Sequence, residues 1–108
     1  MKTTTLGDML PPIHPGEILR EIYLEPLEMT PYALAKKLKV PRTRIERIVA
    51  EKIGINADTA LRLGRFFRTT PQFWLNMQAS YDIKMAEAAL KDQLGEIPEL
   101  ETSDQQAA

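Results

Sequence analysis

Three arginines lie close together near the middle of the chain. The stretch VPRTRIERIVAEK, residues 40–52, contains Arg42, Arg44 and Arg47. A guanidinium group donates two parallel hydrogen bonds, so it can bind O6 and N7 of one guanine together or clamp a phosphate. These residue types at this spacing therefore indicate that the stretch binds an anion, and nucleic acid offers both kinds of acceptor.

Positive charge is concentrated in the same part of the chain. The sequence holds 14 Lys or Arg and 15 Asp or Glu, a formal net charge of -1. Residues 30–68 hold ten of the basic residues and three of the acidic ones, so their net charge is +7 and that of the remaining residues is -8. A basic centre with acidic flanks is expected of a protein that offers one face to nucleic acid. An ordinary solvated charged surface is the alternative.

Prolines and capping residues divide the chain into the helices that position these arginines. Proline suits the first position of a helix because the N–H that it lacks would have no helical acceptor there. Four dipeptides open apolar-periodic runs in this way: His14-Pro15, Thr30-Pro31, Val40-Pro41 and Thr70-Pro71. Asn56 is the expected side-chain cap of a fifth run. The predicted helices cover residues 15–25, 31–38, 41–50, 57–67 and 71–92.

Helical periodicity without any convincing strand pattern predicts an all-α fold. The chain of 108 residues is long enough for one domain. We expect a compact five-helix domain with an extended C-terminal helix over residues 13–95. Residues 1–12 are expected to form a flexible arm. The acidic residues 96–108, with little to bury, are expected to be disordered.

The second and third predicted helices form a helix-turn-helix, whose second helix is suited to the DNA major groove. Ile45 and Ile48 have the spacing of an inward face. The outward face then holds the predicted base-reading residues, which are Arg42, Thr43 and Arg47. Arg44 lies on the flank of this helix and is expected to contact a phosphate. A solvated helix face without a ligand is the alternative.

Several motifs resemble those of a known family. The stretch MTPYALAKKLKVPRTRIERIVAEK resembles the lambda-repressor-like (XRE) helix-turn-helix, with Ala35 at the small position where the two helices touch. HPGEIL at 14–19, VPRTRIERI at 40–48, NADTALRL at 56–63 and TPQFWLNMQASYDI at 70–83 are similar to HigA-type antitoxins of toxin–antitoxin modules. The resemblance covers residues 13–89, and its specificity comes from the four motifs in order.

The resemblance implies a five-helix DNA-binding core and a homodimer that binds an inverted-repeat operator and represses its own operon. It also implies neutralisation of a HigB-type toxin, an endoribonuclease that cleaves messenger RNA. It places base contacts on Arg42, Thr43 and Arg47, and phosphate contacts near Thr30 and Lys52. A stand-alone XRE-family transcriptional regulator without a toxin partner is the alternative.

This sequence departs from the family pattern at two places. Lys39 stands in the turn where Gly is usual, and a residue other than Gly in a left-handed turn costs roughly 1 kcal/mol. The segment AEKIGI after the second helix of the motif has only Lys52 as a basic residue. Phosphate binding by this segment is therefore expected to be weaker than in the family.

Acidic residues recur at helical spacing in the first predicted helix and just beyond it. They are Glu17, Glu21, Glu25 and Glu28. Such a face is suited to docking a basic toxin, and we assign that contact to Glu17, Glu21 and Glu25. A solvated face is the simpler reading. Catalysis by paired carboxylates would need a cleft and shifted pKa values, which an open helix surface does not supply.

The last predicted helix carries an apolar stripe through Met77, Tyr81 and Met85. Its first part is expected to complete the core. Beyond Gln78 nothing in the same chain is expected to cover the stripe, so a second copy is the predicted cover and these three residues the predicted dimer interface. Packing within one chain is the alternative.

Other kinds of site find little support in the composition. The sequence has no Cys and a single His, His14, so no metal site is expected, and His14 is expected to cap the first helix. There is no Gly-rich phosphate loop and no nucleophile beside a base, so we expect neither enzymatic activity nor a cofactor. No leader peptide or membrane span is recognisable, and the expected location is the cytoplasm.

Overall fold

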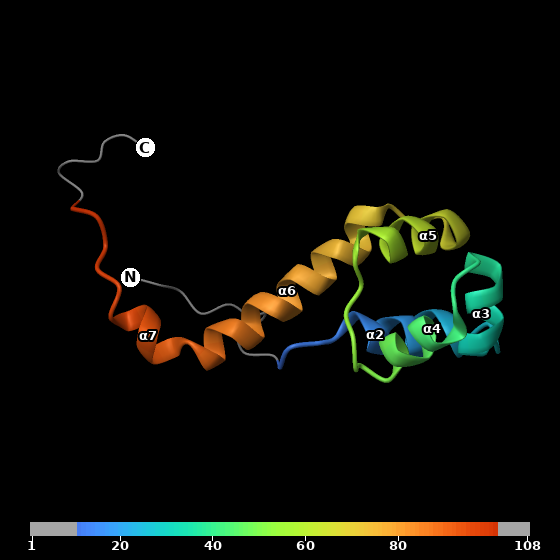
Figure 1. The fold of residues 1–108 in the computed structure, drawn as a ribbon, viewed down its shortest axis with the longest axis horizontal. Coiled ribbons are helices and arrows are strands. Elements are labelled where there is room, and N and C mark those ends of the chain that lie inside the picture. The colour runs from blue at the N-terminus through green and yellow to red at the C-terminus, as the bar shows by residue number, and fades with distance from the viewer. Residues whose placement is uncertain (1–10, 102–108) are drawn as a thin grey trace.

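Every regular element in the computed structural model, which describes residues 11–101, is a helix (Figure 1). The elements are α2 (Pro15–Ile18), η1 (Leu19–Leu24), α3 (Pro31–Leu38), α4 (Arg42–Val49), α5 (Ala57–Phe67), α6 (Pro71–Ala89) and α7 (Lys91–Gly95). The predicted all-α fold is confirmed. Residues 1–10 of the expected arm and 102–108 of the expected tail lie outside the described range, and residues 97–101 follow α7 without regular structure.

The helix starts follow from local capping. In α3, α5 and α6 the N-cap side chain accepts a hydrogen bond from the backbone N–H three residues later, at 2.9–3.1 Å; the caps are Thr30, Asn56 and Thr70. The expected start at Pro41 is wrong by one residue. Pro41 is extended, with φ -60° and ψ 141°, so it is the N-cap and Arg42 is the first residue of α4.

His14 caps α2 as predicted. Its Nδ1 accepts a hydrogen bond from the backbone N–H of Gly16 at 2.9 Å, and only 5% of the residue is exposed. The ring also meets the ring of Tyr81 edge-on, with 4.9 Å between centroids. The single histidine is therefore a structural residue that ties the start of α2 to α6.

Two predicted helices differ from the observed ones in their second halves. The first becomes a π-helix over η1, in which the N–H of Glu25 donates to the carbonyl of Arg20, five residues earlier, at 3.0 Å. The last was expected to continue to residue 92 but ends at Ala89. Leu90 leaves the helical conformation, with φ -105° and ψ 12°, and the short helix α7 follows.

The core lies between the helix-turn-helix and the first turns of α6. Its largest fully buried apolar side chains are Trp74, Leu19, Leu34, Ile45, Ile48 and Leu63. The Trp74 indole N–H donates to Oγ1 of Thr69 at 2.8 Å, so burial leaves no unpaired polar atom on this ring. The rings of Tyr23 and Phe67 pack beside it, with centroids 5.1 and 6.3 Å away. This aromatic cluster joins η1 and α5 to α6.

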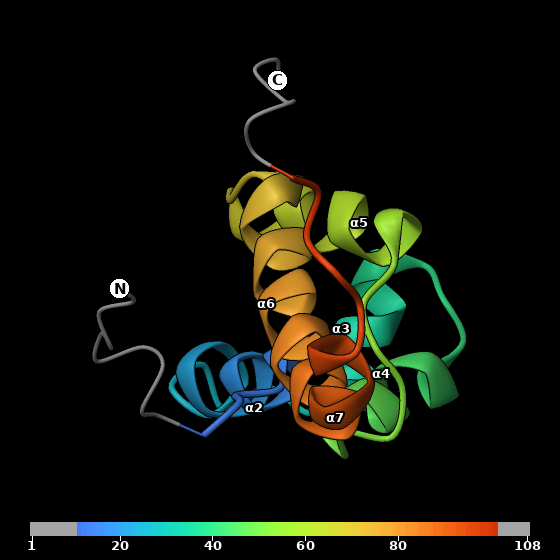
Figure 2. The ribbon, with the colours of Figure 1, turned by 90° about the vertical axis from the view of Figure 1, so that its left-hand side faces the viewer.

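The second half of α6 extends away from this core. In Figure 1, α2 and α4 lie side by side and α5 lies near α3, whereas α6 runs from α5 toward the opposite end of the molecule. Figure 2 shows α7 at the far end of α6, with the helix-turn-helix behind it. The molecule thus has a packed body and a helical extension.

Candidate nucleic-acid interface

α3 and α4 form the predicted helix-turn-helix. Ala35 of α3 is 1% exposed, and Ile45 and Ile48 of α4 are fully buried. The backbone N–H of Val40 donates to the carbonyl of Ala35 at 3.1 Å, which closes the turn. Lys39 in this turn is left-handed, with φ 61° and ψ 45°. The backbone therefore keeps the conformation that favours glycine even though lysine occupies the position.

The predicted base-reading residues lie together on the exposed face of α4. Arg42, Thr43 and Arg47 are all exposed. The Nε of Arg42 is 3.8 Å from a carboxylate oxygen of Glu46, one turn along, and 64% of the Arg42 side chain is exposed. Within residues 11–101, Thr43 and Arg47 make no side-chain hydrogen bond or ion pair. These three side chains can therefore reach a ligand without breaking a strong internal contact.

Arg44 is arranged differently from its neighbours on α4. Its side chain is 33% exposed, and Nη1 donates to Oδ1 of Asp58 on α5 at 2.7 Å. The predicted phosphate ligand is thus directed toward the body of the protein and is held by a carboxylate.

The other two predicted phosphate ligands lie at opposite ends of the motif. Thr30 is the N-cap of α3, and its hydroxyl accepts a hydrogen bond from Ala33 at 3.0 Å. The N-terminus of a helix presents unpaired N–H groups and a positive dipole end, so the start of α3 is suited to a phosphate. Lys52 is exposed in the segment after α4 and makes no side-chain contact with the described residues.

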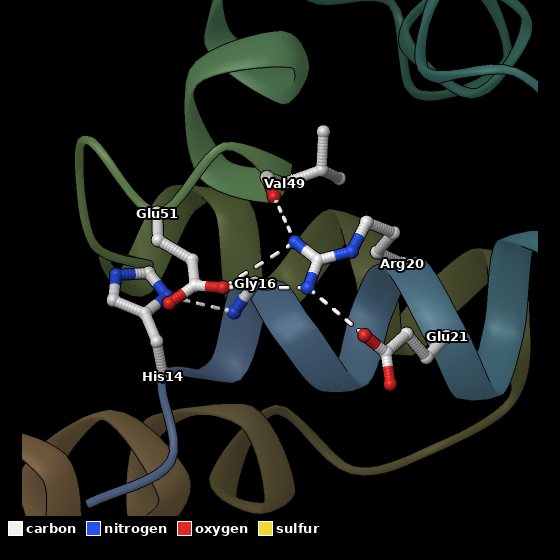
Figure 3. Close-up of polar contacts among 6 residues, drawn as sticks. All are labelled: His14, Gly16, Arg20, Glu21, Val49 and Glu51. Carbon is white, nitrogen blue, oxygen red and sulfur yellow. Dashed lines mark hydrogen bonds and ion pairs between the residues drawn. The ribbon is translucent and has the colours of Figure 1, made fainter.

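Arg20, which the sequence did not single out, holds the end of α4 (Figure 3). Its Nη1 donates to the backbone carbonyl of Val49, the last residue of α4, and lies 3.4 Å from a carboxylate oxygen of Glu51. Its Nη2 donates to Glu21 at 3.0 Å. Glu21 and then Glu51 hold the pKa of this guanidinium above its ordinary value. A cation at a helix C-terminus also interacts favourably with the helix dipole.

Gly16 allows α2 to approach α4 closely. A Cβ built on Gly16 would collide with the backbone carbonyl of Ile48. Because that carbonyl belongs to a buried helix backbone, only glycine fits at this crossing without displacing α4. Gly16 and Arg20 therefore both set the position of the helix that carries the base-reading residues.

Asp58 and Arg62 connect α5 to both helices of the motif. Oδ1 of Asp58 accepts from Nη1 of Arg44 and also from Nε of Arg62, at 2.8 Å. Nη1 of Arg62 donates to the carbonyl of Leu38, the last residue of α3, at 2.7 Å. Arg62, and after it Arg44, holds the pKa of the Asp58 carboxyl below its ordinary value. Asp58 also lies in the first turn of α5, near the positive end of the helix dipole.

The predicted dimer residues differ in exposure. Met77 packs against the core, Tyr81 is half-buried, and Met85 is 48% exposed. The interpretation that nothing in the same chain covers the stripe beyond Gln78 is wrong for Tyr81, because His14 contacts its ring. Other exposed apolar side chains in this part of the chain are Ile83 on α6, Leu90 at the C-cap of α6 and Leu94 on α7.

The predicted acidic face is shorter than its spacing indicated. Glu17 and Glu21 lie on the first helical segment, but Glu21 accepts a hydrogen bond from Arg20. Glu25 is the C-cap of η1, and Glu28 lies in the following turn with φ 52°. The π-helical turn and the chain reversal after it break the α-helical periodicity on which the prediction rested.

Residues 11–101 hold neither a metal-binding group nor a membrane-spanning helix. No group of three His, Cys, Asp or Glu side chains there is placed to hold a metal ion. No helix in that range is long and apolar enough to cross a membrane.

The fold is similar to that of solved antitoxins. One is the Pseudomonas aeruginosa antitoxin HigA with the higBA promoter, at 48% identity and a TM-score of 0.79; the match covers 82% of this chain and 96% of that one. Another is the antitoxin GraA in complex with its operator, at 39% identity and a TM-score of 0.81, with 93% and 97% covered.

Characterised sequences give similar matches. Virulence-associated protein I of Dichelobacter nodosus is 60% identical over 78 residues, 72% of each chain. Antitoxin HigA-1 of Vibrio cholerae is 33% identical over 72 residues, 67% of each chain. No protein-family model matches the chain.

The buried side of α4, the left-handed turn before it and the exposed basic face define a helix-turn-helix DNA-binding protein. Within this class, the solved relatives that share the fold over nearly their whole length are antitoxins. The chain belongs to the HigA antitoxin family.

Proposed function

We propose that this protein is a homodimeric repressor that binds an inverted-repeat operator, and that it is also the antitoxin of a type II toxin–antitoxin module. The observation that carries the proposal is the exposed face of α4, where Arg42, Thr43 and Arg47 stand without strong internal partners on a helix-turn-helix. Relatives at 39% and 48% identity carry operator or promoter DNA in their structures. Such a protein works where the DNA is, in the cytoplasm, and by binding, without enzymatic activity.

In this proposal Arg42, Thr43 and Arg47 read base edges, and Thr30 and Lys52 contact phosphates. A bidentate arginine–guanine pair discriminates by about 1–3 kcal/mol against a wrong base, whereas a phosphate contact carries no sequence information. Base readout and phosphate binding are therefore separable by mutation.

The operator duplex upstream of the reading frame and a random duplex of equal length test this division. Arg42→Ala should weaken operator binding by about 1–3 kcal/mol and leave random DNA nearly unchanged. Lys52→Ala, the matched control, should weaken binding to both duplexes and lower the salt slope by about one. Equal losses on the two duplexes for Arg42→Ala would exclude base reading by this residue.

The toxin is proposed to be a HigB-type ribonuclease that docks on the acidic side of the first helical segment, with Glu17, Glu21 and Glu25 as contacts. Because Glu21 is bonded to Arg20, its reversal would also disturb the end of α4. Glu17 and Glu25 make no side-chain hydrogen bond or ion pair within the described residues, so they are the better pair to change.

Co-expression with the product of the adjacent gene tests this surface. Glu17→Lys together with Glu25→Lys should slow association with a basic toxin and reduce rescue of translation, while operator binding is retained. Unchanged rescue by the double variant would move the toxin contact to another surface.

A stand-alone regulator without a toxin is the second candidate. It is favoured by relatives described as HTH-type transcriptional regulators, among them YbaQ of Escherichia coli at 37% identity over 82 residues. The neighbouring reading frame separates the two candidates. A product that stops translation when expressed alone, and is neutralised by this protein, supports the antitoxin.

A further inference from the structure

We propose that Asp58 controls access of Arg44 to the DNA backbone and thereby raises the preference of this protein for its operator over random DNA. The inference rests on the proposed operator binding and adds a residue that does not itself touch DNA. Its starting point is the single carboxylate oxygen of Asp58 that accepts from both Arg44 and Arg62, at 2.7 and 2.8 Å.

The two arginines are held unequally. Arg62 has a second acceptor, the carbonyl of Leu38 at 2.7 Å, which fixes it against the end of α3. Within residues 11–101, Arg44 has Asp58 as its one side-chain partner. Loss of the carboxylate would therefore leave Arg62 in place and release Arg44.

The position of Arg44 makes its release relevant to DNA. It lies one turn before Arg47 on α4, on the flank of the exposed face. A guanidinium group binds a carboxylate and a phosphate through the same planar pair of donors. Asp58 takes the Nη1 donor of Arg44, so a DNA phosphate that binds this guanidinium through a pair that includes Nη1 must displace the carboxylate.

The ion pair is weak enough to exchange. About half of the Asp58 side chain and a third of the Arg44 side chain are exposed, and exposed pairs of this kind contribute little to stability. A phosphate displaces the carboxylate only where the duplex is held in register beside α4. The base contacts of Arg42, Thr43 and Arg47 hold the operator in that way, whereas on random DNA Arg44 stays with Asp58.

The salt dependence of binding measures this contact directly, because each additional phosphate contact steepens the slope of log affinity against log salt by about 0.9. The substitution Asp58→Asn keeps the shape of this side chain and removes its negative charge. It should steepen the slope on random DNA by about one, so that the ratio of affinities at 50 and 200 mM salt rises about fourfold. The slope on operator DNA should be unchanged.

The variant Asp58→Asn with Arg44→Gln separates release of Arg44 from simple loss of negative charge. The double variant should return the slope on random DNA to that of the unaltered protein. An unchanged slope in Asp58→Asn, or a steeper slope that persists in the double variant, would overturn the proposal.

Arg44→Gln alone gives a test that leaves Asp58 in place. It should lower the salt slope on operator DNA by about one. The salt slope on random DNA should be unchanged, because Arg44 does not contact random DNA while Asp58 holds it. Equal effects on both duplexes would contradict the proposal. Failure of the unaltered protein to prefer its operator over random DNA would instead remove the proposed function, and the effects of the Asp58 and Arg44 variants on random DNA could still be measured.

Discussion

Charged residues occupy left-handed backbone positions in this protein where glycine would fit at lower cost. Within residues 11–101 the four positions are Glu28, Lys39, Glu51 and Arg68, with φ between 52° and 62°. For Glu51 the side chain offers a compensation, because its carboxylate lies 3.4 Å from Arg20. For Lys39 no side-chain hydrogen bond or ion pair with the described residues offsets the backbone cost.

Lys39→Gly should therefore stabilise the domain. We expect a gain of roughly 1 kcal/mol in the free energy of unfolding, because glycine adopts the observed φ of 61° without a Cβ clash. Urea denaturation followed by circular dichroism measures it. Lys39→Ala is the matched control, since it removes the same charge and keeps the Cβ. An equal gain in the alanine variant would show that charge, and not backbone conformation, sets the cost.

At the scale of helices, the sequence predicted beginnings better than interiors and ends. Thr30, Asn56 and Thr70 cap helices through contacts within three residues, so their types and places were sufficient evidence. Local propensity did not indicate the π-helical turn of η1 or the interruption at Leu90.

The contacts that hold the ends of α3 and α4 could not be predicted from the sequence, for a different reason. Arg20 and Val49 are 29 residues apart, and Leu38 and Arg62 are 24 apart. Each pairs an arginine with a backbone carbonyl, and every residue has a carbonyl, so no second residue type marks the partner. The exposed arginines of α4 were predictable from helical periodicity, whereas the residues that hold this helix in place were not.

For the molecule as a whole, the exposed apolar residues on the extension are the main feature that one chain does not explain. Ile83 and Met85 are 57% and 48% exposed on α6. Tyr81 is covered in part by His14, so changing it would disturb the domain as well as any interface. Met85 is the better single position for testing whether the predicted stripe holds two copies together.

Met85→Glu should yield folded monomers at micromolar concentration, because a two-fold contact would bury the introduced carboxylate from both chains. Light scattering measures the mass, and operator affinity should fall steeply because one helix-turn-helix reads too few base pairs. Ile83→Glu is the matched control and should remain dimeric, since two residues along a helix separate the side chains by about 200°. The reverse outcome would place the interface on the side of Ile83.

Because α6 is continuous from the core to its exposed end, its length fixes the distance between the two. Trp74 is buried in the body and Met85 lies three turns away, about 16 Å along the same unbroken helix. If two copies meet near Met85, the length of this helix sets the distance between their recognition helices. Insertion of one residue into α6 between Trp74 and Met85 would shift the contact between the two copies by about 1.5 Å and rotate it by about 100° about the helix axis. In related proteins, a change in the length of α6 would then have to be accompanied by a change in the spacing of the operator half-sites.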